Sequence, residues 1–290
     1  MIDLKAYLAR QAERCDAALE RWVPLETTPP HTIHKAMRYS LFAGGKRVRP
    51  VLCMAAFEAV GSAREGIADA ACTLEMIHTY SLIHDDLPAL DNDDLRRGRP
   101  TNHKVFGEAM AILAGDSLLT LAFEVLGRLP YGGPLVAELA RASGTVGGMI
   151  GGQVHDIEGE RQTPTAELLD QIHRAKTGAL LRCSLRMGAL YAEATPEQLA
   201  ALTAYGEHVG LAFQIVDDIL DIEASPEELG KTPGKDEAQA KITFPAVYGL
   251  ARSRQMAEAE RLAAHAALAG FDAKAEPLRA LADFIVQRKG

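Results

Sequence analysis

The chain has 290 residues, 48% of them hydrophobic and 24% charged, which is the composition of an ordinary globular protein. Its 31 Lys and Arg against 39 Asp and Glu give a net charge of −8, which argues against a nucleic-acid partner because phosphate backbones bind to broad basic faces. The charged N-terminal segment lacks the apolar stretch of a signal peptide, and no apolar run approaches the roughly 20 residues that cross a bilayer, so we expect a soluble cytoplasmic protein without membrane insertion.

Helical periodicity dominates the chain, and no convincing pattern of alternating strand residues is found. Pro and Gly residues interrupt the apolar segments, which predicts helices near residues 4–22, 31–43, 50–60, 65–87, 104–128, 134–157, 165–193, 196–223, 236–265 and 275–288. Several of these helices are apolar on most sides, as are the buried inner helices of a bundle. No linker is long or polar enough to divide the chain, so we predict an all-α, single-domain bundle over residues 1–290.

The cysteines are scattered along the chain and form no C-x-x-C pair. They lie in helical, largely apolar contexts at Cys15, Cys53, Cys72 and Cys183. We therefore expect reduced core thiols, as in cytoplasmic proteins, and no disulfide framework.

Glycines are concentrated inside the predicted helix 134–157, where each costs roughly 1 kcal/mol relative to Ala. They are Gly144, Gly147, Gly148, Gly151 and Gly152. No strand precedes them, which argues against a dinucleotide-binding fingerprint. The pattern therefore indicates the close approach of another helix or of a bulky ligand.

Two aspartate clusters each end a strongly apolar helix. The first contains Asp85, Asp86 and Asp91, and the second contains Asp217, Asp218 and Asp221. Carboxylates repel one another on a shared helix face, and the C-terminus of a helix is the unfavourable end for anions, so both clusters require a compensating cation. Hard oxygen ligands without a neighbouring His or Cys set indicate Mg²⁺ bridged to substrate phosphates.

The alternative for one acidic cluster is a solvated surface, but two clusters behind buried apolar helices make that interpretation weak. Asp85 and Asp91 are six residues apart, a spacing that a straight helix cannot align. Pro88 lies between them. Because proline ends or kinks a helix, we expect Asp91 to swing back toward Asp85.

Basic residues suited to a diphosphate follow two predicted helices. In the sequence GGKRVRP, Gly44 and Gly45 allow close backbone approach, and Lys46 and Arg49 supply cations, while Pro50 is predicted at the first position of the next helix. A second group, LRRGRP, contains Arg96 and Arg97 and directly follows the first acidic cluster. Its arginines could instead neutralise the adjacent aspartates, and the two roles are compatible.

These motifs resemble those of short-chain trans-prenyl diphosphate synthases, and most closely the bacterial-type farnesyl diphosphate synthases. The matching segments are GGKRVRP, EMIHTYSLIHDDLPALDNDDLRRGRPTNH, KTG at Lys176, FQIVDDILD, LGK at Lys231 and KITFPA from Lys241. Their order, spacing and flanking residues agree over about residues 31–290. The resemblance implies a bundle of about ten long helices around a central cavity, usually as a homodimer.

The resemblance also implies roles for individual residues. Asp85, Asp91 and Asp217 would be magnesium ligands, about three ions per site with substrate bound, supported by Asp86, Asp218 and Asp221. The allylic diphosphate would contact Arg96, Lys176, Thr177, Gln214 and Lys231. Isopentenyl diphosphate would contact Gly45, Lys46, Arg49, His78 and Arg97. Lys176 and Lys231 would assist the three aspartates in catalysis.

The implied reaction is head-to-tail condensation of isopentenyl diphosphate with dimethylallyl and then geranyl diphosphate. Tyr80 and Ser81 lie five and four residues before Asp85, and an aromatic ring there would stop the product at fifteen carbons, although Tyr80 could be ordinary core. A geranylgeranyl or geranyl diphosphate synthase remains an alternative. A non-catalytic subunit of a heteromeric synthase and a terpene cyclase are expected to lose or change one acidic cluster, which this chain retains.

Overall fold

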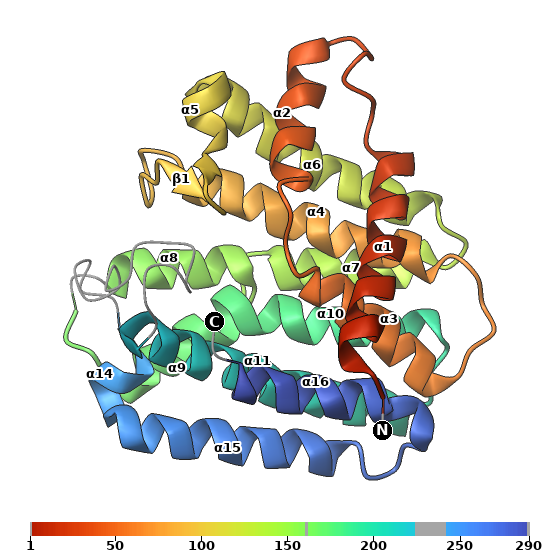
Figure 1. The fold of residues 1–290 in the computed structure, drawn as a ribbon, viewed down its shortest axis with the longest axis vertical. Coiled ribbons are helices and arrows are strands. Elements are labelled where there is room, and N and C mark those ends of the chain that lie inside the picture. Colours follow the sequence, from red (N-terminus) through yellow and green to blue (C-terminus); the bar gives the residue numbers. More distant parts are fainter. Residues whose placement is uncertain (1, 160–161, 224–241, 289–290) are drawn as a thin grey trace.

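The computed structural model describes residues 2–159, 162–223 and 242–288, and it is almost entirely helical (Figure 1). The longer helices are α1 (Leu4–Trp22), α2 (His31–Leu41), α3 (Val48–Val60), α4 (Ile67–Asp85), α6 (Glu108–Arg128), α7 (Gly132–Ser143), α8 (Met149–Gly159), α9 (Ala166–His173), α10 (Ala179–Tyr191), α11 (Pro196–Glu223), α15 (Leu250–Ala267) and α16 (Glu276–Gln287). The shorter elements are α5 (Asn102–Phe106), α14 (Phe244–Tyr248), the π-helical turn η1 (Arg174–Gly178), the 3₁₀ turn η2 (Ala273–Ala275) and the strands β1 (Leu95–Arg96) and β2 (Arg99–Pro100). The all-α fold class is confirmed.

Local sequence signals start several of these helices. The Asp3 side chain accepts a hydrogen bond from the Ala6 amide at 3.0 Å and caps α1. Before α11, the Thr195 amide donates to the Gln198 side chain while the Gln198 amide donates to the Thr195 hydroxyl. This reciprocal pair is a capping box, which satisfies amides that have no partner inside the helix. The predicted segments 4–22 and 196–223 therefore match α1 and α11.

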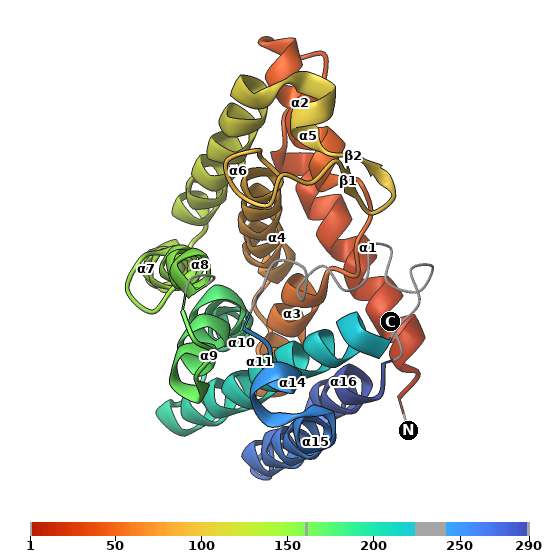
Figure 2. The same cartoon turned by 90° about the vertical axis from the view of Figure 1, so that its left-hand side faces the viewer.

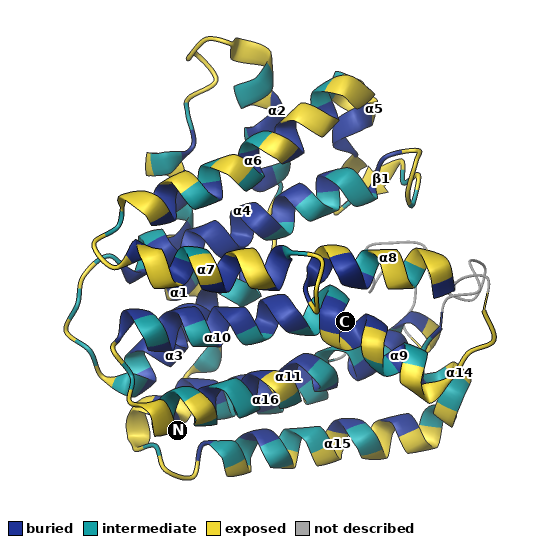
Figure 3. Cartoon of the chain, turned by 180° about the vertical axis from the view of Figure 1, so that it is seen from behind, coloured by how far each residue is buried: buried dark blue, intermediate teal, exposed yellow. Residues whose placement is uncertain are grey.

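The helices pack in layers around α10, which contacts α3, α4, α7 and α11 (Figures 1 and 2). On one side α4 packs against α6, and on the other α11 packs against α15 and α16. Figure 3 shows α4 and α10 almost wholly buried, whereas α6 and α15 carry exposed residues on their outer faces. The C-terminal ends of α4 and α11, which carry the two acidic clusters, point toward the same end of the bundle (Figure 1).

Helix α6 is the one described segment long and apolar enough to cross a membrane by length and composition, which the sequence analysis did not anticipate. In the most apolar stretch of this helix, 39% of the residues are buried inside the protein. The helix packs against α2, α4, α5 and α7. The core helix of a soluble protein passes the same test, so α6 is weak evidence for a membrane span. Its outer face exposes Ile112 and Leu113, at 45% and 52%.

Five details of the predicted secondary structure were wrong. The segment predicted as one helix over 104–128 is divided at Gly107, whose φ is 85°, between the end of α5 and the start of α6. Residues 134–157 form two helices, because residues 144–148 make a turn between α7 and α8. Residues 165–193 contain the π-helical turn η1 between α9 and α10. The described part of 236–265 begins outside any helix at residues 242–243 and is broken at Gly249, whose φ is 78°. The two-residue strands β1 and β2 pair antiparallel, although no strand was predicted. The single-domain organisation stays a prediction.

Candidate active site

The first acidic cluster is built by the end of α4 and the turn that follows it. The helix ends at Asp85, before Pro88, and the Asp91 amide donates to the Asp85 carbonyl oxygen at 2.8 Å. The chain therefore bends back at Pro88, as the sequence predicts. Asp86 is 3% exposed and accepts hydrogen bonds from Nε and Nη2 of Arg96 at 2.6–2.9 Å, so the neutralising role of Arg96 is present.

Asp85 is the carboxyl group of this cluster whose ionised form is destabilised most by its surroundings. Burial, together with the charges of Asp91 and Asp86, raises its pKa to about 6, against the lowering effect of Lys176 and Arg96. A carboxylate in such surroundings gains from a nearby cation, because the cation offsets both the desolvation and the repulsion. The electrostatics therefore favour cation binding at this end of α4.

The second acidic cluster lies on the last two turns of α11. Asp217 is partly exposed and accepts a hydrogen bond from Nη2 of Arg288 at 2.9 Å. Asp218 is buried, accepts the Phe244 amide at 2.8 Å and lies 3.5 Å from Nε2 of His173. Asp221 is also buried, at 4% exposure. Asp217 is thus the most accessible carboxylate of the cluster, and Asp218 and Asp221 lie in the protein interior.

The segment from α9 into η1 lies between the two clusters. His173 contacts Asp218, and its Nδ1 accepts a hydrogen bond from Nε2 of Gln214 at 3.0 Å. Burial lowers the pKa of His173 to about 4, so its imidazole is neutral at pH 7. One turn later, Lys176 is close enough to Asp85 and Asp91 for their charges to raise its pKa, against the lowering effect of burial. Lys176 therefore lies near the first cluster and Gln214 lies beside His173 at the second, while Thr177 follows Lys176 in η1.

Lys176 forms an ion pair that the sequence analysis missed. Its Nζ lies 2.6 Å from Oδ2 of Asp156 on α8. Asp156 stands four residues after Gly152, in the glycine-rich segment for which a close helix approach was predicted. That signal could have indicated the neighbourhood but not the partner. Lys231 and Lys241 lie outside the described residues.

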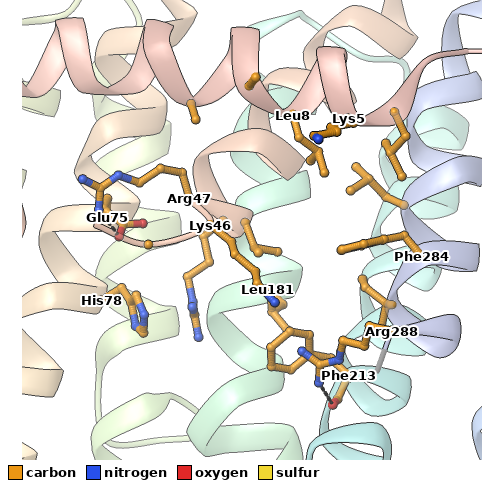
Figure 4. Close-up of a pocket in the computed structure, with 18 of the residues that line it drawn as sticks. Lys5, Leu8, Lys46, Arg47, Glu75, His78, Leu181, Phe213, Phe284 and Arg288 are labelled. Carbon is orange, nitrogen blue, oxygen red and sulfur yellow. Dashed lines mark hydrogen bonds and ion pairs between the residues drawn. The ribbon is translucent and has the colours of Figure 1, made fainter. Parts of the chain in front are cut away.

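A cavity of about 880 Å³ adjoins the second cluster and collects every residue predicted to contact isopentenyl diphosphate. These residues are Gly45, Lys46, Arg49, His78 and Arg97. Figure 4 shows His78 and Lys46 pointing into this space from one side. The opposite wall comes from α1, α11 and the end of α16, and it includes Arg288. Its other residues, among them Lys5, Leu8, Phe213 and Phe284, were missed by sequence reasoning.

The turn between α2 and α3 gives the cavity its basic wall. Gly44 and Gly45 have φ values of 88° and 134°, which favour glycine. A Cβ on Gly45 would stand 2.8 Å from Nη1 of Arg97, whose guanidinium donates to the Gly44 carbonyl oxygen. Glycine is therefore required for Arg97 to lie against the turn.

Pro50, which follows this turn, differs from expectation, and Arg47 has a role that was not predicted. Pro50 is the third residue of α3, which begins at Val48, and not the first. It is tolerated there because the first amides of a helix have no intrahelical partner. Arg47, at 4% exposure, pairs with Glu75 and Asp16 at 2.8 Å each, so it holds the turn in place.

The remaining charges of the cavity favour an anionic ligand. Burial, followed by the charges of Arg49 and Arg97, lowers the pKa of His78 well below its ordinary value, so the imidazole is neutral at pH 7. A neutral imidazole can donate one hydrogen bond without adding charge. Burial also lowers the pKa of Arg49, partly offset by Glu75 and Asp217. The cavity thus offers Arg49, Arg97 and Lys46 as cations beside a neutral donor.

The two residues predicted to set product length lie on the interior part of α4. Tyr80 is 5% exposed, its ring centroid is 5.7 Å from that of His84 in an edge-to-face arrangement, and burial raises its pKa to about 12. Within the described part of the chain its hydroxyl is buried without a hydrogen-bond partner. The Ser81 hydroxyl donates to the His78 carbonyl oxygen at 2.8 Å. Tyr80 is thus a large buried ring about one and a half turns from Asp85.

The sequence profile of the polyprenyl synthetase family matches residues 30–279. A relative from Arabidopsis thaliana, the chloroplastic geranylgeranyl pyrophosphate synthase 3, is 51% identical over 99% of this chain and 82% of its own length. The large subunit 1 of a heterodimeric geranylgeranyl pyrophosphate synthase from the same plant is 49% identical over 99% and 80%.

A solved structure, an FPP/GFPP synthase from Zymomonas mobilis, superposes with a TM-score of 0.86 at 37% identity over 98% of this chain and 99% of that one. The fold of that enzyme is therefore the fold of this chain. The profile match covers most of the sequence, and the relatives align over nearly all of it. The chain belongs to the polyprenyl synthetase family and is a short-chain prenyltransferase.

Proposed function

We propose that this enzyme condenses isopentenyl diphosphate with dimethylallyl and then geranyl diphosphate, head to tail, to form farnesyl diphosphate. One observation carries the proposal: two helices each serve both an acidic site and the basic cavity. Helix α4 presents His78 to the cavity and ends at Asp85, and α11 presents Phe213 to the cavity and carries Asp217 one turn later. Two diphosphates bound at these sites would lie side by side.

The donor chemistry of the acidic clusters fits Mg²⁺. Among the described residues, no three His, Cys, Asp or Glu side chains form a ready-made cage. Magnesium rarely uses such a cage, because it binds through one or two carboxylates and completes its shell with water and substrate phosphates. Asp85, Asp91 and Asp217 would hold the ions, with Asp86, Asp218 and Asp221 behind them. When bound, Mg²⁺ neutralises the charge that develops on the departing diphosphate.

Side chains between the clusters complete the allylic diphosphate site in this proposal. Lys176, Thr177 and Gln214 would donate to its oxygens, with Arg96 sharing its guanidinium between Asp86 and the ligand, and Lys231 is a further candidate. In the cavity, Lys46, Arg49 and Arg97 would hold the second diphosphate, with the neutral His78 as an added donor.

The proposed reaction breaks the bond between C1 and oxygen of the allylic substrate, and the electron pair leaves with the diphosphate. The double bond of isopentenyl diphosphate then supplies the electrons of the new carbon–carbon bond to C1. A proton leaves the resulting cation and is taken up by the released diphosphate, so no dedicated basic side chain is needed. The surrounding buried helices exclude water, which would otherwise convert the cation to an alcohol.

The product length follows from Tyr80 in this proposal. A buried aromatic ring about 7.5 Å along α4 from Asp85 would block growth beyond fifteen carbons. The Zymomonas mobilis neighbour named as an FPP/GFPP synthase supports farnesyl diphosphate, whereas the plant relatives are named geranylgeranyl synthases and support the twenty-carbon alternative. A non-catalytic subunit is disfavoured because both acidic clusters are retained.

We further propose a cytoplasmic homodimer that uses the outer face of α6. Ile112 and Leu113 are half exposed on this face, and a second copy could cover them. The heterodimeric plant relative makes a second, different subunit the competing possibility. The four cysteines are buried free thiols, which is consistent with a reducing compartment. Light scattering of the purified chain distinguishes a dimer from a monomer.

The function is tested by incubating the enzyme with isopentenyl diphosphate and each allylic primer, with and without magnesium, followed by chromatography of the products. The proposal predicts farnesyl diphosphate from dimethylallyl and from geranyl diphosphate, in the presence of magnesium only. A twenty-carbon product would transfer the assignment to the geranylgeranyl alternative. Absence of any prenyl product from every primer would contradict the function.

A further inference from the structure

Lys176, proposed above as a ligand of the allylic diphosphate, is held by a carboxylate on a different helix. The Asp156 side chain on α8 lies 2.6 Å from Nζ of Lys176, and the two side chains are only 14% and 26% exposed. Burial by itself would lower the pKa of Lys176, and Asp156 is the largest influence that raises it, ahead of Asp85 and Asp91. Asp156 is therefore the main counter-charge of this lysine.

The backbone geometry shows that α8 is fitted to this contact. Gly152 lies one turn before Asp156, on the same face of α8. A Cβ on Gly152 would stand 2.5 Å from the Cα of Lys176 and would also overlap its amide nitrogen. Lys176 itself lies in the π-helical turn η1, an irregularity that is frequent at functional sites. Two neighbouring positions on α8 thus fix both the backbone and the side chain of Lys176.

A carboxylate beside a diphosphate site weakens binding because it repels the ligand, so Asp156 needs a compensating function. The surroundings of Lys176 indicate that function. Asp85 and Asp91 are close enough to influence the lysine, so without Asp156 the ammonium group would move toward them. The ammonium group of Lys176 would then form ion pairs with the carboxylates that are proposed to hold cations, and it would no longer face the diphosphate.

We propose that Asp156 is a positioning residue that holds Lys176 between the two acidic clusters and away from Asp85 and Asp91, in a contact that Gly152 permits. This inference rests on the proposed function of Lys176 as a diphosphate ligand. Asp156 acts through the lysine and does not itself touch substrate. Its contribution therefore exists only while Lys176 is present.

The test is calorimetric titration of inorganic pyrophosphate into the intact enzyme with magnesium present. Asp156→Asn should weaken pyrophosphate binding about tenfold, which is the scale of one charge-assisted hydrogen bond. Asp156→Glu, which keeps the charge on a longer side chain, should give an intermediate affinity. The matched control is Asp170→Asn, which removes the same charge from the exposed pair with Arg174 at 2.7 Å, and it should bind as the wild type does.

A double-mutant cycle separates positioning from a general structural effect. In a Lys176→Ala background, Asp156→Asn should no longer weaken pyrophosphate binding, since the residue through which it acts is gone and only a repelling carboxylate is removed. Gly152→Ala should weaken binding like Asp156→Asn, whereas Gly133→Ala on α7, where a Cβ meets nothing within 4 Å, should not. If Asp156→Asn does not fold, judged by thermal unfolding, Asp156→Glu takes its place in the cycle.

Two results would overturn the inference: unchanged pyrophosphate affinity in Asp156→Asn, or effects of Asp156→Asn and Lys176→Ala that simply add. Failure of the proposed function is recognised separately, because it appears as the absence of prenyl product from the wild-type enzyme. A wild-type enzyme that makes prenyl product, together with an Asp156→Asn variant that binds normally, would refute only the inference.

Discussion

The turn that forms the basic wall of the cavity is held by a buried ion pair of Arg47, and replacing Arg47 by Met should lower the free energy of unfolding. Arg47 has φ 49° and connects the α2–α3 turn to the interior through Glu75 on α4 and Asp16 on α1, each at 2.8 Å. It also donates to the Leu41 carbonyl oxygen at 2.9 Å. Glu75 is only 2% exposed, so removing the guanidinium leaves a buried carboxylate without its principal partner.

The expected cost follows from that burial. Removing one member of a buried ion pair costs about 3–5 kcal/mol, because the remaining charge stays desolvated. For a chain of 290 residues, with an unfolding entropy of about 2.1 cal/mol/K per residue, this loss lowers the melting temperature by about 5–8 °C. Urea denaturation, followed by far-ultraviolet circular dichroism, measures the free energy of unfolding directly.

The matched control replaces both partners. Arg47→Met together with Glu75→Leu removes the pair and leaves no buried charge, so the double variant should recover most of the lost stability. An exposed pair gives the comparison at the surface: Arg128→Met, which loses a contact with Glu124, should cost less than 1 kcal/mol. A loss of under 1 kcal/mol in Arg47→Met would refute the reasoning, since it would mean that Glu75 is neutral or solvated.

Three further predictions concern ligands and pH. Tyr80→Ala should lengthen the product beyond that of the wild type, measured by chromatography, and an unchanged product would remove Tyr80 as the stop. Arg288→Ala should lower, by severalfold, the magnesium concentration needed for half-maximal pyrophosphate binding. The reason is that the guanidinium, which lies 2.9 Å from Asp217, no longer competes with a cation for this carboxylate. A higher magnesium concentration at half-maximal binding would contradict this prediction. For His78, whose folded-state pKa is lowered, the unfolded chain binds the proton first, so stability falls as pH drops below about 6.5, by at most about 1.4 kcal/mol per pH unit. His78→Gln should lose less stability than the wild type between pH 7 and pH 5 in urea titrations, and equal losses would show that His78 titrates normally.

The sequence predicts those parts of the fold that depend on local signals. Asp3 and Thr195 sit where caps belong, and α1 and α11 begin as predicted. The glycine-rich segment shows the limit of such signals. Gly152 does lie against another backbone, as predicted, but the neighbouring glycines break the helix at residues 144–148, and their local cost alone does not distinguish a tolerated glycine from a turn. The π-helical turn at Lys176 packs against α8, a contact between helices that no local sequence pattern reports.

The candidate site divides in the same way. Residues within motifs were identified together with their neighbours: Asp91 returns to Asp85 because Pro88 ends α4, and Gly45 lies against Arg97. Residues that reach the site from other helices were not identified as partners: the glycines of α8 indicated a close approach, but not that Asp156 pairs with Lys176. The wall formed by α1 and α16 around the cavity was also missed, because single residues on amphipathic helices are indistinguishable from ordinary core.

We propose that Asp85 and Asp217 bind one diphosphate through shared cations. Calorimetric titration of pyrophosphate with magnesium tests this in the wild type, Asp85→Ala, Asp217→Ala and the double variant. We predict that each single variant loses most of the binding and that the double variant loses little more, because both carboxylates serve one site. Full affinity in either single variant would contradict the claim, as would losses that are independent and additive.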